Sequence, residues 1–194
     1  EARRACCGRC GCAPGACARI AWVTTVMLVA LCPAFGQDRK KLYDEGTEAL
    51  YSLDFSTAEA RFRKLTEMDP ENPANWNLVA SSLWLKIVAA QQKLNMESFS
   101  GSSVGTEASQ NVVNATNEKQ LRDTIATAIS KADARLKVNR RDVQALYAKG
   151  VAKGTLATFE AVAKESYISA LSNAREARNL HADVLKEDPA FTDA

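Results

Sequence analysis

The sequence predicts an all-α fold of antiparallel helix pairs that follow an N-terminal leader. Apolar residues recur at intervals of three and four after position 38, which is the period of an amphipathic helix. Proline-containing turns separate these runs, because proline disfavours a helical conformation in the residue before it. The composition, with 46% hydrophobic, 25% charged and 7% aromatic residues, fits an ordinary helical core.

Residues 1–36 have the order of a signal peptide, in which basic residues precede an apolar run and a small-residue cleavage site. The apolar run, residues 20–31, is about a dozen residues long, whereas a membrane-spanning helix needs about 20. Ala34 and Gly36 provide the cleavage site and predict a mature chain from Gln37. We therefore expect an exported protein, periplasmic or secreted, with no membrane insertion after cleavage.

A membrane-tethered form, through an uncleaved leader or a lipidated Cys32, is the alternative. The bulky Leu31 before this cysteine fits lipoprotein processing poorly. All six cysteines lie at or before position 32, so the mature chain needs no oxidative folding. Cys7 and Cys10 have the spacing of half a zinc site, but no second pair supplies the other two ligands. The sequence thus predicts no metal and no cofactor.

The charge of the chain gives no reason to expect a nucleic acid as partner. The whole sequence has a formal net charge of +2. The predicted leader holds four of the 25 basic and one of the 23 acidic residues, which leaves a net charge of about −1. A nearly neutral chain creates no strong field for an anionic polymer or an acidic membrane.

The first expected helix pair covers residues 38–69. Its break falls at residues 53–56, where Asp54 or Ser56 can cap the second helix. A turn at residues 69–73 closes the pair, because it contains two prolines. The next expected helix, residues 76–94, has a broad apolar face and therefore contacts on two sides.

Residues 98–106 contain two glycines and predict a flexible connection. A long helical stretch follows over residues 107–138, with a break near residues 114–117 as an alternative. Two more helices are expected over residues 143–158 and 160–187. The first of them contains Gly150 and Gly154, which cost about 1 kcal/mol each relative to alanine. We expect a neighbouring helix to approach closely at these glycines.

A pattern of large, small and aromatic positions recurs three times after the leader. The three units read, in order, Leu42-x2-Glu45-Gly46-x2-Ala49 with Ala58-x3-Phe62 and Asp69-Pro70; Trp76-x2-Val79-Ala80-x2-Leu83; and Leu146-x2-Lys149-Gly150 with Ala163-x3-Tyr167, Ala170 and Asp188-Pro189. The pattern resembles that of tetratricopeptide repeat proteins of a bacterial exported type, whose unit is about 34 residues long.

The resemblance implies an α-solenoid. Residues 38–97 hold the first repeat and the start of the second, and residues 107–194 hold degenerate repeats that continue beyond this fragment. It also implies close helix contacts at the small residues and gap-filling aromatic residues between units: Gly46, Ala80, Gly150, Ala58 and Ala163 for the first role, Phe62 and Tyr167 for the second. Because an uncapped repeat exposes an apolar face, self-association through that face is also expected.

The same resemblance implies a non-catalytic scaffold that binds a partner protein or peptide in a concave groove. The first helix of each unit would line the groove with Lys40, Tyr43, Thr47, Tyr51, Asn77, Ser81, Trp84, Tyr147, Val151 and Thr155. Family members that clamp a carboxylate use lysine, arginine and asparagine, and only Lys40 and Asn77 are of these types here, so no clamp is expected. Ordinary helix packing is the alternative role for Tyr43, Trp84 and Tyr147.

The sequence does not predict an enzyme. It shows no nucleophile with a base, no metal cluster and no phosphate loop, since residues 101–105 lack the Lys-Ser/Thr pair of such a loop. His181 is the only histidine, and we expect it to be exposed or engaged at a helix end. The alternative function is an accessory helical module of a larger protein whose catalytic domain lies downstream of residue 194.

Overall fold

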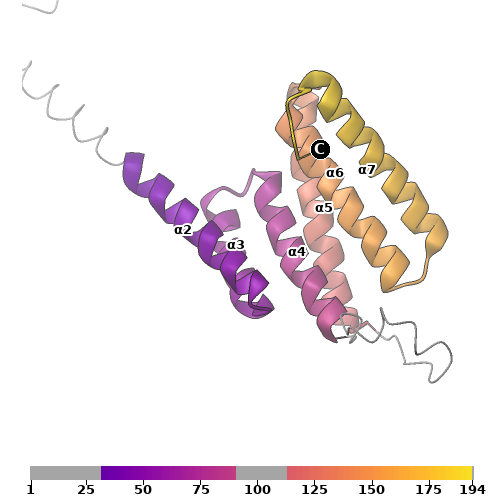
Figure 1. The fold of residues 1–194 in the computed structure, drawn as a ribbon, viewed down its shortest axis with the longest axis horizontal. Coiled ribbons are helices and arrows are strands. Elements are labelled where there is room, and N and C mark those ends of the chain that lie inside the picture. The colour runs from indigo at the N-terminus through magenta and orange to yellow at the C-terminus, as the bar shows by residue number, and fades with distance from the viewer. Residues whose placement is uncertain (1–31, 91–112, 194) are drawn as a thin grey trace, which may run out of the picture. The chain divides into compact units, whose positions relative to one another are not determined.

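The computed structural model describes residues 32–90 and 113–193, and their side chains from Asp38 onward. In these residues the structure has six helices and no strand (Figure 1). The helices are α2 (Cys32–Tyr51), α3 (Phe55–Met68), α4 (Pro73–Ala90), α5 (Ala115–Val138), α6 (Val143–Val162) and α7 (Tyr167–Glu187). The prediction of an all-α fold is confirmed for the described residues. Residues 1–31 of the predicted leader and the predicted flexible connection lie outside them.

The chain divides into two compact units, residues 1–41 and residues 42–194. Of the first unit, the structure describes residues 32–41, which form the first half of α2. The predicted cleavage site, residues 34–37, is helical in this segment. All the other helices belong to the second unit.

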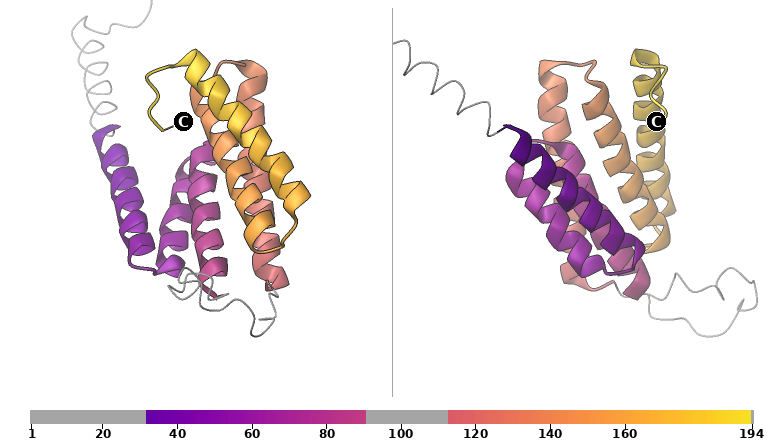
Figure 2. Two further views of the ribbon diagram at one scale, coloured as in Figure 1. Left: turned by 45° about the vertical axis from the view of Figure 1, so that its right-hand side comes forward. Right: turned by 60° about the vertical axis from the view of Figure 1, so that its left-hand side comes forward.

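Within the second unit, consecutive helices pack against one another. Helix α4 contacts both α3 and α5, and α6 contacts α5 and α7. Helix α6 also contacts α4, so the first members of two successive helix pairs touch directly. Both views of Figure 2 show α4, α5, α6 and α7 side by side. This direct contact of α4 with α6 creates the surface on which the candidate site lies.

The same turn follows α3, α5 and α7. The residue after each helix, Asp69, Asn139 or Asp188, donates its amide to the carbonyl four residues earlier. Three residues further on, the amide of the chain returns to the carbonyl of that turn residue, with N···O distances of 3.3, 3.1 and 3.1 Å. Residues at equal distances from Asp69, Asn139 and Asp188 therefore occupy equivalent positions.

Two glycines of the first helices lie under rings of the second helices. A β-carbon at Gly46 would come within 2.5 Å of Cε1 of Phe62, which is 1% exposed. A β-carbon at Gly150 would come within 2.8 Å of Nε2 of His181. His181 lies seven residues before Asp188, as Phe62 lies seven residues before Asp69. The two rings are thus equivalent in register and in contact.

This register corrects the third repeat unit. Ala163 and Tyr167 were expected on the second helix of that unit, but α6 continues to Val162 and Ala163 caps its end. Tyr167 is the first residue of α7 and is 69% exposed, so it fills no gap. The chain reverses here because Glu165 adopts a positive φ of 55°, a conformation that few residues other than glycine take. Ala177 and His181 take the positions assigned to Ala163 and Tyr167.

Caps define the other helix starts. Asp54, rather than Ser56, caps α3 and accepts a hydrogen bond from the amide of Thr57 at 3.0 Å. Asn114 caps α5, so that helix begins within the range given as an alternative break.

The expected close approach of a neighbouring helix at Gly154 was wrong. In the described part of the chain nothing beyond its own helix backbone and chain neighbours lies within 4 Å of a β-carbon placed there.

Helix α7 buries one stripe and exposes another. Its buried residues are Ala170, Ala177 and Val184. Ile168 and Leu171 are 89% and 62% exposed. An apolar face of the last described helix is therefore uncovered by the described residues.

Candidate functional site

A pocket of about 320 Å³ lies among the first helices of successive pairs. It is lined by Tyr43 from α2, by Ala74, Asn77, Leu78 and Ser81 from α4, by Gln144, Tyr147, Ala148 and Val151 from α6, and by Asp193 after α7. All these residues belong to the second unit. The pocket is thus formed by segments far apart in the sequence.

The lining residues occupy only a few positions of the repeated register. Ala74, Gln144 and Asp193 each lie five residues after a turn residue. Asn77 and Tyr147 lie eight residues after Asp69 and Asn139. The residues one and four positions further along each helix also line the pocket, namely Leu78 and Ser81 on α4 and Ala148 and Val151 on α6. Apart from Tyr43, the pocket is therefore lined by equivalent positions on α4, on α6 and after α7.

Half of the predicted groove residues line this pocket. They are Tyr43, Asn77, Ser81, Tyr147 and Val151. Lys40 belongs to the first unit, residues 1–41. Thr47, Tyr51, Trp84 and Thr155 do not line it. The structure thus places the pocket toward the N-terminal ends of α4 and α6.

Trp84 packs within the protein. Its ring meets that of Phe159 edge to face, with 6.1 Å between the centroids. Phe159 is fully buried, and Trp84 packs against the core that contains it. In the structure Trp84 therefore has the packing role that the sequence analysis named as the alternative.

Five lining residues were absent from the prediction: Ala74, Leu78, Gln144, Ala148 and Asp193. These residues could have been predicted from their position rather than from their type, since each lies a fixed number of residues after the turn that precedes it. Asp193 is the residue that this spacing would have added most usefully, because it is the only charged residue of the lining.

Asn77 links the two helices that form the pocket. Its Nδ2 donates a hydrogen bond of 2.8 Å to the carbonyl of Ala148, from α4 to α6. The side chain is 8% exposed, and its Oδ1 is buried without a partner in the described part of the chain. An unpaired buried acceptor costs about 1–3 kcal/mol. Asn77 therefore leaves a buried, uncompensated partial negative charge beside the pocket.

Tyr147 is fixed by rings on two sides. Its centroid lies 5.4 Å from that of His181 and 5.0 Å from that of Phe191. Burial raises the pKa of the Tyr147 hydroxyl, and the negative charge of Asp193 and the nearby Tyr43 raise it further. The ring therefore remains a neutral phenol at neutral pH.

His181 was expected to be exposed or engaged at a helix end, and this was wrong. It lies between Gly150 and Tyr147, and its Nδ1 is buried without a partner in the described part of the chain. Burial lowers the pKa of its imidazole. The histidine therefore supports the pocket from behind as a neutral ring.

The lining combines oxygen atoms with apolar surface. Tyr43, Asn77, Ser81, Gln144 and Tyr147 carry side-chain oxygens, and Asp193 adds a carboxylate. The remaining lining residues are alanine, leucine and valine. No lysine or arginine is among the ten, so the pocket itself offers no cation to a carboxylate ligand.

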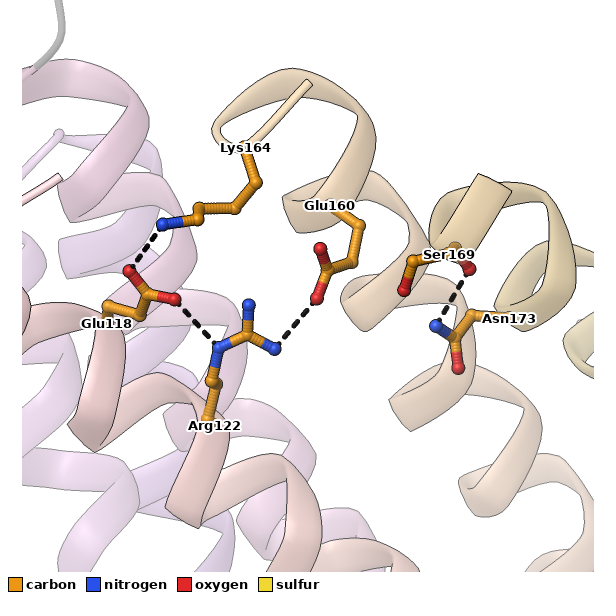
Figure 3. Close-up of polar contacts among 6 residues, drawn as sticks. All are labelled: Glu118, Arg122, Glu160, Lys164, Ser169 and Asn173. Atoms are coloured by element: carbon orange, nitrogen blue, oxygen red, sulfur yellow. Dashed lines mark hydrogen bonds and ion pairs between the residues drawn. The ribbon is translucent and has the colours of Figure 1, made fainter. Parts of the chain in front are cut away.

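A separate charged cluster joins α5 to α6 (Figure 3). Arg122 contacts Glu118 at 2.9 Å and Glu160 at 2.7 Å, while Lys164 contacts Glu118 at 3.0 Å. Burial opposes the charge of Arg122, but its bonds to Glu160 and Glu118 outweigh burial and raise its pKa. The guanidinium also lies 4.9 Å from the ring centre of Phe159. These mutually paired charges form a structural link between the two helices.

Neither a metal centre nor a membrane span is found in the described segments. Within residues 32–90 and 113–193, no group of three or more histidine, cysteine, aspartate or glutamate residues could hold a metal ion. None of the helices described is both long and apolar enough to cross a bilayer.

Comparison with protein-family models, curated proteins and solved structures finds no match. The resemblance to tetratricopeptide proteins therefore stays a prediction.

Proposed function

We propose that this protein is a non-catalytic scaffold with a tetratricopeptide-like solenoid, which binds a segment of a partner protein in the pocket between α2, α4 and α6. One observation carries this proposal. Nine of the ten lining residues lie five, eight, nine or twelve residues after one of the equivalent turn residues Asp69, Asn139 and Asp188, so that the pocket follows the register of the repeated turn. In solenoids the small rotation between units creates extended binding surfaces of this kind.

The repeated architecture is supported by two independent features. The turns after α3, α5 and α7 share the same backbone hydrogen bonds. The close contact of Gly46 with Phe62 recurs as the contact of Gly150 with His181. A backbone feature and a packing feature therefore have a common register.

The chemistry of the pocket suits a polypeptide segment. Its volume of about 320 Å³ falls in the range of ligand-sized sites. Tyr43 lines the pocket and is 47% exposed, and tyrosine is among the residues that dominate binding energies at protein interfaces. The hydroxyl and amide groups of the lining can bond to the backbone of a bound segment. We propose that this binding takes place outside the cytoplasm, after removal of the leader.

A matched pair of substitutions on α6 tests the proposal. Peptides would be selected from a random displayed library on the full natural chain beginning at Gln37, and their affinities measured by fluorescence polarisation. Val151→Arg fills the pocket, whereas Thr155→Arg places the same side chain one turn further along, outside the lining. Both positions are partly exposed, so both variants should fold.

We expect Val151→Arg to weaken the selected peptides by about tenfold or more and Thr155→Arg to leave their affinity unchanged. Thermal unfolding of both variants provides the control for folding. Failure to select any peptide, or equal affinity of the two variants, would overturn the proposed function.

A further inference from the structure

We infer that the pocket takes a basic side chain, lysine or arginine, from the partner segment. This inference rests on the proposed function and specifies the chemistry of the partner. Its first support is charge complementarity. Asp193 is the one charged residue among the ten that line the pocket, and it carries a carboxylate.

The second support is the unpaired oxygen of Asn77. Its amide nitrogen is already engaged with the carbonyl of Ala148. Its Oδ1 is buried and has no partner among the described residues. The group therefore adds partial negative charge beside the pocket without a donor to neutralise it, and it attracts a bound cation through space, because the buried oxygen is closed to direct contact.

The third support is the aromatic and apolar surface of the lining. Tyr43 and Tyr147 both contribute to the pocket, and a cation is attracted to the face of such rings. Leu78, Ala148 and Val151 offer apolar contacts. Lysine and arginine combine a long aliphatic stem with a charged head, so one side chain uses both kinds of surface.

The opposite ligand chemistry is disfavoured by the same residues. A C-terminal carboxylate in this pocket would be repelled by the carboxylate of Asp193 and by the buried oxygen of Asn77, with no basic residue in the lining to pair with it. An acidic side chain would meet the same repulsion. The one charged side chain of the lining therefore has the opposite sign to the charges of a carboxylate clamp.

The inference is tested with the peptides selected on the full chain. We expect each peptide that loses affinity to Val151→Arg to contain a lysine or arginine whose replacement by methionine weakens binding by about tenfold. Asp193→Asn should weaken these peptides by about threefold, since the carboxylate is exposed and screened. Asp193→Lys should weaken them further and should favour peptides with glutamate at the same place.

Asp183→Asn is the matched control, because it removes a carboxylate that pairs with Lys186 on α7 outside the lining. It should leave the affinities unchanged. Peptides that need Val151 but contain no essential basic residue, or that ignore Asp193→Lys, would overturn this inference while the proposed function stands. If no peptide depends on Val151, both are overturned.

Discussion

The imidazole of His181 lies directly against Gly150, where an added β-carbon would approach Nε2 to 2.8 Å. The same relationship joins Phe62 to Gly46 in the first helix pair. Each glycine therefore sets the distance between the two helices of its pair. Because Tyr147 in turn contacts His181, the spacing of α6 and α7 also supports the pocket.

Gly150→Ala should destabilise the protein, and Gly154→Ala should stabilise it. Alanine gains about 1 kcal/mol over glycine in either helical position. At Gly150, however, the new methyl group forces the His181 ring aside, and overpacking costs about 1–3 kcal/mol. Urea unfolding of the two variants measures the difference. Equal free energies of unfolding would show that the helix contact at Gly150 is not tight.

The stability of the protein should fall as the pH is lowered below about 6.5, in part through His181. Burial lowers the pKa of this imidazole in the folded state, so the unfolded chain binds a proton first and unfolding becomes easier. The contribution levels off once the pH is below the folded-state pKa. His181→Phe, which copies Phe62, should reduce this dependence. Unfolding at pH 7.5 and pH 5.5 measures it, and an unchanged pH dependence in the variant would contradict the assignment.

Arg122→Met should lower the free energy of unfolding by about 1–2 kcal/mol. The substitution leaves the nearly buried carboxylate of Glu160 without its guanidinium partner, although solvent near Arg122 moderates the cost. A double-mutant cycle with Glu160→Met should show positive coupling. Lys119→Met is the control, because its pair with Asp123 is well exposed and should contribute less than about 0.5 kcal/mol. Equal losses for Arg122 and Lys119 would argue against a structural link.

Trp84→Ala should reduce stability without reducing the affinity of the folded protein for its peptides. The substitution removes the edge-to-face contact with Phe159 and part of the core. For a partly buried tryptophan we expect a loss of about 2–4 kcal/mol. Calorimetry gives the stability, and polarisation at low temperature gives the affinity. A large loss of affinity in the folded variant would instead place Trp84 in the binding surface.

The helices and turns were largely readable from the sequence, because apolar period and turn residues are local signals. The end of α6 was not. The residues around Ala163 continue an alanine-rich helical pattern. The chain reverses after α6 through a positive φ at Glu165, and a glutamate in the sequence does not indicate such a conformation. Ala163 and Tyr167 have the spacing of the expected motif, although they lie on opposite sides of this turn.

Only half of the residues that line the candidate site were predicted, because the rest depend on how the helices pack and on the register of the turns. Trp84 follows Asn77 by two helical turns and lies on nearly the same face, so the sequence assigns both to the groove. In the structure α6 is long enough to bring Phe159 against Trp84. Asp193 was missed because its position depends on the register of the last turn, which only the repeated hydrogen bonds made plain.

The most direct test of the binding surface is the NMR spectrum of the side-chain amides of the full chain, recorded during titration with a selected peptide. Asn77 and Gln144 line the pocket. Asn173, whose amide donates to the carbonyl of Ser169 on α7, does not (Figure 3). Binding in the pocket should produce saturable shifts of the Asn77 and Gln144 amide signals and leave the Asn173 signal unmoved. Peptide binding that leaves the Asn77 and Gln144 signals in place would show that the peptide binds elsewhere.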